Sequence, residues 1–212
     1  MKNQSNYLKN KRLKILQLSK KIIAEEGLTS QIFEKISTKY NIDINEINLL
    51  FPGGKSDFLK FVSEQLNIEL EETCKKFDLL RMPVHKRIKK ILLSKIYLME
   101  KEKNFYKKIF FNLLISKKNI SFPNQLYKSV DQIWYIAGDT SVDFNFYTKR
   151  LILAGVYSRV ILYFFNNNNQ KELEEILDLS LKRVAKIPEL KSRINLFKDY
   201  VPKVFKFLKN SI

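Results

Sequence analysis

Apolar residues recur along the chain at the spacing of one helical face. From residue 9 to residue 26 apolar and charged residues follow this spacing, and the pattern ends at Gly27. It predicts an amphipathic helix that stops at the glycine. Two short helices are predicted next, through residues 32–36 and 44–50, and the Pro-Gly-Gly run at 52–54 ends the second one.

Longer helices are predicted in the rest of the chain, at residues 57–77, 84–102, 104–117, 122–137, 142–165, 171–187 and 191–210. Only five glycines and five prolines are present, which leaves little material for the turns of a β fold. We therefore predict an all-α protein. The three short helices at the start are typical of a helix-turn-helix. The expected organisation is a helix-turn-helix-like head at 1–56, a helical body at 57–188 and an amphipathic tail at 189–212.

The head is similar in spacing to the DNA-binding head of TetR-family repressors. The similarity lies in residues 36–43, Phe51 and residues 55–59, and the chain length also fits a TetR-like head on a ligand-binding body. The resemblance implies a TetR-like fold in which the last helices of the body form a homodimer. It also makes a DNA-binding transcriptional repressor the alternative function for this chain.

The residues that would read DNA do not suit that function. No Lys or Arg lies between Tyr40 and Lys55, and Asp43 and Glu46 stand at the start of the expected recognition helix. Contacts to phosphates and bases need cationic or amide donors, and carboxylates repel the DNA backbone. The family commonly carries Tyr where this chain has Asn48. We therefore expect a head that keeps the fold and has no nucleic-acid partner.

A second resemblance is carried by residues 134–157, WYIAGDTSVDFNFYTKRLILAGVY, and by the FPGG element at 51–54. Both resemble the ubiquinone (coenzyme Q) biosynthesis accessory proteins of the Coq-nine type, although that family usually carries Trp at the place of Phe146. The resemblance implies a TetR-like protein that binds an isoprenoid quinone or other lipid in its body. It also implies peripheral membrane association and partnership with the di-iron demethoxyubiquinone hydroxylase.

The signature is predicted to form a corner between two helices. Gly138 is placed to end one helix in a left-handed cap, and Thr140-x-x-Asp143 resembles a capping box that starts the next. Helix capping alone is one role for the polar residues, and a partner-binding surface is the other. The candidate partner-binding residues are Trp134, Asp139, Asp143, Phe146, Tyr147 and Arg150.

The helix that follows, at 144–165, is apolar nearly all round and is expected to be buried on several sides. Its apolar residues could serve the core, a dimer interface and a lipid cavity, and the sequence does not divide them among these roles. The candidate lipid-binding residues are Leu153, Val156, Tyr157 and Val160.

The net charge of +17 points to a polyanionic partner, although part of the Lys excess fits the codon bias of an A+T-rich gene.

Residues 191–212 carry six Lys or Arg against Asp199 and place apolar residues on one helical face. This pattern predicts an in-plane helix on an anionic membrane, with docking of the helix on the body as the alternative. The candidate membrane-binding residues are Ile194, Phe197, Val201, Lys203, Val204, Phe205, Lys206 and Leu208. Residues 86–118 are also basic, with eleven Lys or Arg against two Glu.

Cys74 and His85 are the single residues of their kinds, which limits the possible chemistry. One chain cannot supply the ligands of a zinc or di-iron site, so we expect no metal, no catalytic residues and no cofactor other than a bound isoprenoid lipid or quinone.

A lone Cys favours a reducing compartment. No signal peptide is evident, and the apolar run 151–165 is too short to span a bilayer. The expected location is cytoplasmic, peripheral on the inner face of the cell membrane.

Overall fold

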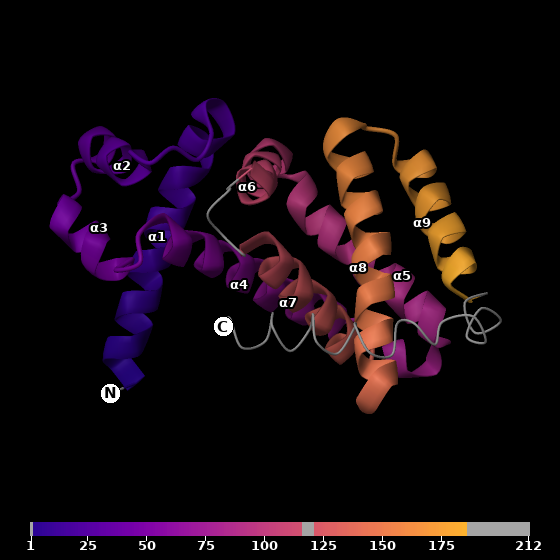
Figure 1. Cartoon of the computed structure of the whole chain (residues 1–212). Helices are drawn as coiled ribbons and strands as arrows, with labels where there is room; N and C mark the ends of the chain where they lie inside the picture. Colours follow the sequence, from indigo (N-terminus) through magenta and orange to yellow (C-terminus); the bar gives the residue numbers. More distant parts are fainter. Residues whose placement is uncertain (1, 116–120, 186–212) are drawn as a thin grey trace. The chain divides into compact units, whose positions relative to one another are not determined.

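The computed structural model describes residues 2–115 and 121–185, and these fold into α-helices joined by turns (Figure 1). In chain order the elements are α1 (Lys2–Glu26), α2 (Ile32–Tyr40), α3 (Ile44–Leu50), α4 (Lys55–Cys74), the 3-10 helix η1 (Leu79–Arg81), α5 (Val84–Glu100), α6 (Lys103–Ile115), α7 (Ser121–Ile136), α8 (Asp143–Asn166) and α9 (Gln170–Ala185). The predicted all-α fold class is confirmed for this part of the chain. The predicted tail at 189–212 lies outside the described residues.

Two of the helices end at a residue that adopts a left-handed backbone conformation. Gly27 adopts a left-handed φ of 85° after α1, and Asn41 adopts a φ of 51° after α2. Asn is one of the few side chains that tolerates this region, so Asn41 ends α2 with a left-handed cap although it is not a glycine. The first helix begins earlier than predicted, at Lys2, because no Gly or Pro interrupts residues 2–10.

The chain divides into two compact units. Of the described residues, unit 1 comprises 2–65 and 99–115, and unit 2 comprises 66–98 and 121–185. In unit 1, α1 packs against α2, α3 and α6. Because α6 joins α1 in this way, unit 1 contains more of the chain than the head expected at 1–56.

Aromatic side chains form much of the core of unit 1. Phe33, Phe51 and Phe58 lie with their ring centroids 5.6 to 6.1 Å apart. The guanidinium of Arg12 lies 4.2 Å from the centroid of the Phe61 ring and 4.8 Å from that of Phe51. Aromatic pairs and cation–π contacts add to the stabilisation from burial. The FPGG element therefore contributes Phe51 to the core as well as ending α3.

In unit 2, α8 packs against both α7 and α9 (Figure 1). Its buried residues include Leu153, Val156 and Val160, as expected for a helix that is apolar nearly all round. An ion pair joins α5 to α9, with Lys89 Nζ 2.8 Å from Asp178 Oδ2. Unit 2 thus positions the α7–α8 corner that the signature predicted.

Candidate functional site

The corner between α7 and α8 is made by Gly138. This residue has a φ of 77°, which a side chain would strain. Its N–H donates to Tyr135 O at 3.0 Å, and the N–H of Asp139 donates to Trp134 O at 3.0 Å. These two bonds form a Schellman motif and confirm the predicted left-handed cap. The predicted capping box is wrong, because α8 begins at Asp143 after Val142, whose side chain has no group to cap it.

Arg150 connects this corner to both helices. Its side chain is 5% exposed, its Nε lies 2.6 Å from Asp131 Oδ1 on α7, and its Nη1 lies 3.2 Å from Asp139 Oδ2. The Nη1 group also donates to Phe146 O at 3.2 Å. A buried guanidinium needs such partners because an unpaired buried charge costs several kcal/mol. The network therefore holds the end of α7 against the first turns of α8.

Asp139 is the acceptor at the centre of the network. Its side chain is 4% exposed, and it accepts from Lys149 Nζ at 2.7 Å and from Ser141 Oγ at 2.7 Å. Burial alone would raise the pKa of Asp139, but the hydrogen bonds from Lys149 and Ser141 outweigh it and lower the pKa below its ordinary value. The carboxylate is therefore held ionised, as a structural acceptor for its neighbours.

Aromatic rings lie next to the charged groups. Trp134 Nε1 donates to Lys149 O at 3.2 Å, and Lys149 Nζ lies 5.3 Å from the centroid of the same ring. The guanidinium of Arg150 lies 3.3 Å from the centroid of the Phe146 ring, which meets Tyr147 edge-on at 5.2 Å. The phenyl group at position 146 keeps the flat surface that the family's usual Trp would offer.

The structure brings together five of the six predicted partner-binding residues, namely Trp134, Asp139, Phe146, Tyr147 and Arg150. The side chain of Asp143 lies outside the described part. Because Asp139 and Arg150 are buried among their own partners, they position the corner, and their direct contact with another protein stays a prediction.

Several residues of this corner are not among the predicted site residues, including Lys149 and Ser141, which donate to Asp139, and Arg87, which donates to Ala137 O at 2.8 Å. Asp131 pairs with Arg150 from a position before the signature. Tyr135 and Val142 lie within the signature and are 68% and 71% exposed, respectively. Both residues flank the helix ends at the corner. This position in the sequence was the signal that could have identified them as exposed apolar side chains.

The four predicted lipid-binding residues are all buried in unit 2. Leu153, Val156, Tyr157 and Val160 are between 0% and 7% exposed. Their burial fits the core role that the sequence left open, and a role in lipid binding stays a prediction. A buried lysine lies beside them: Lys95 Nζ is 5.4 Å from the centroid of the Tyr157 ring.

Lys95 was also missed from the sequence. It is 1% exposed, and its Nζ donates to Asn67 Oδ1 at 3.0 Å. Burial lowers the pKa of Lys95 to about 7. The sequence contained a signal for the burial of Lys95. The residue lies four positions after Ile91 and four before Met99, which are both buried, and so falls on the apolar stripe of α5.

The head offers no cationic face on α3. Asp43 accepts from Asn45 N at 2.9 Å as the N-cap, and Glu46 pairs with Lys11 at 2.5 Å. The exposed residues of α3 are Asn45, Asn48 and Leu49. These side chains carry no positive charge for phosphate contacts.

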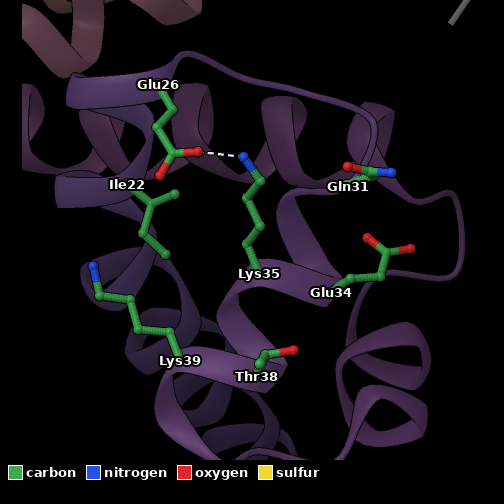
Figure 2. A pocket seen from close by; sticks show the side chains of 7 residues that line it. All are labelled: Ile22, Glu26, Gln31, Glu34, Lys35, Thr38 and Lys39. Carbon is green, nitrogen blue, oxygen red and sulfur yellow. Dashed lines mark hydrogen bonds and ion pairs between the residues drawn. The ribbon is translucent and has the colours of Figure 1, made fainter.

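An open pocket of about 620 Å³ lies at α1 and α2 in the same unit. Figure 2 shows the ion pair between Glu26 and Lys35 across it, with Glu34 and Lys39 also on its lining. Two carboxylates balance two ammonium groups, so this surface does not attract a polyanion either.

The described residues offer neither a metal site nor a membrane span. Among the described residues, His, Cys, Asp and Glu side chains do not gather in threes as a metal site would require. No helix within the described ranges combines the length and apolarity of a bilayer span. The eight predicted membrane-binding residues, from Ile194 to Leu208, lie outside the described residues.

Part of the chain is similar to known proteins. Residues 121–188 match the family model of COQ9. The ubiquinone biosynthesis protein COQ9, mitochondrial, of Bos taurus is 40% identical over 60 residues, which is 28% of this chain and 19% of that protein. Its counterpart of Rattus norvegicus is 39% identical over 59 residues, 27% of this chain and 19% of that protein. The probable ubiquinone biosynthesis protein coq9, mitochondrial, of Dictyostelium discoideum is 41% identical over 59 residues, with the same two shares.

The matched part spans about a fifth of the length of these relatives. The resemblance to the Coq-nine type is confirmed for residues 121–188, which contain α7, α8 and α9. The names of the relatives assign them to mitochondria, whereas the location of this chain stays a prediction.

Proposed function

We propose that this chain is a non-catalytic accessory protein of ubiquinone biosynthesis. It binds an isoprenoid quinone precursor at a membrane surface and presents it to the di-iron demethoxyubiquinone hydroxylase. The observation that carries the proposal is the match of residues 121–188 to COQ9, together with relatives named as ubiquinone biosynthesis proteins. A carrier is useful in this pathway because a long isoprenoid tail makes the precursor nearly insoluble outside a bilayer.

The partner surface in this proposal is the α7–α8 corner. The Asp139–Arg150 ion pair makes the corner rigid, and Tyr135 and Val142 project large apolar side chains from it. Rigid aromatic and apolar side chains are the groups that interface cores favour. The proposed contact therefore runs through Tyr135 and Val142, with Trp134 beside them and the ion pair behind.

The lipid in this proposal enters unit 2 beside α8. Support comes from the buried apolar face of that helix, on which Leu153, Val156, Tyr157 and Val160 follow one another at helical spacing. The membrane contact is assigned to the basic amphipathic segment 191–212, on the sequence pattern alone. A homodimer is proposed on the TetR resemblance.

The first test is solvent extraction and native mass spectrometry of the purified full chain. The expected result is an isoprenoid quinone or precursor that co-purifies in stoichiometric amount. An empty protein, or one that carries phospholipid only, would contradict the quinone role.

The second test is a pull-down with the demethoxyubiquinone hydroxylase. Tyr135→Ala is expected to weaken the complex without loss of helical content, because the side chain is 68% exposed. Leu179→Ala is the matched control, since it removes an apolar side chain that is 51% exposed from α9, away from the corner. Equal binding by both variants would rule out the corner as the contact surface.

A further inference from the structure

A groove in unit 2 combines apolar and cationic side chains. It encloses about 600 Å³ and is lined by Met82, His85, Lys86, Lys89, Lys90, Leu93, Asp178, Leu181 and Lys182. These residues come from α5, from the end of α9 and from the segment before α5. The volume lies within the range of small-molecule sites. None of these residues belongs to the α7–α8 corner or to the buried apolar face of α8.

The cations of the groove outnumber its anions. Lys89 is shared between Asp178 at 2.8 Å and Glu174 at 3.7 Å, which raises its pKa chiefly through the hydrogen bond to Asp178. Lys86, Lys90 and Lys182 are exposed and form no ion pair with any residue that the structure describes, and Lys90 Nζ lies 4.3 Å from the centroid of the Phe77 ring. Three ammonium groups without an ion-pair partner line this groove and attract an anion, and a phosphate is a common target of lysine.

The same groove also offers an apolar surface. Met82 and Leu181 are half-buried, and Leu93 is 9% exposed at its inner side. A free phosphate would leave these side chains in water, whereas a hydrocarbon chain would cover them. The basic segment 191–212 of this chain is a poor occupant, because its +5 charge opposes that of the lysines.

We propose that the α5–α9 groove binds one anionic lipid. The phosphate headgroup lies between Lys86 and Lys182, and the hydrocarbon chain lies against Met82, Leu93 and Leu181. This inference does not rest on the proposed function, because it uses other residues and a ligand of different charge.

The test is calorimetric titration of the full chain with dihexanoyl phosphatidic acid, kept below the concentration at which it forms micelles. Dihexanoyl phosphatidylcholine supplies the same chains without net charge, and inorganic phosphate supplies the charge without chains. The phosphatidic acid is expected to bind more tightly than both. Equal binding of the phosphatidylcholine would overturn the role of the lysines, and equal binding of phosphate would overturn the role of the apolar residues.

Two double variants separate the site from the overall charge. Lys86→Ala with Lys182→Ala is expected to weaken binding of the phosphatidic acid roughly 30-fold, at about 1 kcal/mol for each lysine. Lys101→Ala with Lys171→Ala removes the same charge from exposed positions outside the groove and is expected to leave binding unchanged. An equal loss in both double variants would show a general charge effect and refute the site. All of these outcomes leave the extraction of isoprenoid lipid as an independent test of the proposed function.

Discussion

Replacing Lys95 with methionine removes a buried amine from unit 2 and keeps an unbranched side chain of similar length. Lys95 is 1% exposed, and its Nζ contacts the Asn67 side-chain oxygen at 3.0 Å and lies 5.4 Å from the centroid of the Tyr157 ring. Both neighbours are uncharged, so neither offsets the loss of hydration that the ammonium suffers on burial. The cost of that burial is expected to appear in the pH dependence of stability.

The magnitude follows from the pKa of Lys95, which burial lowers from 10.5 to about 7. Between these values the unfolded chain holds a proton that the folded chain has released, so the free energy of unfolding rises with pH. Below about pH 7 both states are protonated, and the full cost of the buried charge remains. Each pKa unit is worth about 1.4 kcal/mol, which gives a gain of about 2 kcal/mol from pH 7 to pH 9. Lys95→Met lacks this gain.

The assay is urea unfolding of the wild-type protein and of Lys95→Met at pH 6, 7, 8 and 9. Burial also raises the pKa of the Cys74 thiol, which makes stability fall with rising pH in both proteins, so the difference between them is the quantity to compare. We expect the stability of Lys95→Met relative to the wild type to fall by about 2 kcal/mol from pH 7 to pH 9. Lys86→Met, at an exposed position of the same helix, is expected to run parallel to the wild type. Parallel curves for Lys95→Met would refute the reasoning and show that Lys95 keeps an ordinary pKa.

The remaining predictions concern the corner and are measured by urea unfolding followed by circular dichroism. Arg150→Ala is expected to destabilise the protein by about 3 kcal/mol, because it leaves the 4%-exposed Asp139 with one cation fewer, and a loss below about 1 kcal/mol would contradict the network. Lys149→Ala is expected to cost about 1 kcal/mol or less, since its side chain is 41% exposed. Because its partners lower the pKa of Asp139, the stability that this carboxylate adds is present above pH 3.8 and is lost as the pH falls further. Gly138→Ala is expected to cost about 1–2 kcal/mol at its φ of 77°, whereas Gly155→Ala in α8, with open space at the new Cβ, is expected to stabilise by about 0.5–1 kcal/mol.

The sequence by itself determined the elements and the place of the corner. Helix ends follow Gly27 and Gly138, and the order of helices follows from apolar spacing, because both depend on residues within a few positions of one another. The signature at 134–157 likewise located the segment that is similar to COQ9, because that similarity depends on residues that are adjacent in the sequence.

Only the tertiary structure decided what the polar residues of that segment contact. The sequence marks Asp139 and Arg150 as candidate partner-binding residues, and the structure adds that they pair with each other. Asp131 also pairs with Arg150, from 19 positions earlier in the chain. Lys95 belongs to the basic stretch 86–118, yet its side chain lies in the core. The surroundings of a charge depend on side chains that other helices bring to it, and no local spacing specifies those neighbours. The periodicity of a chain therefore predicts its helices, whereas the burial and pairing of its charges follow from how those helices pack.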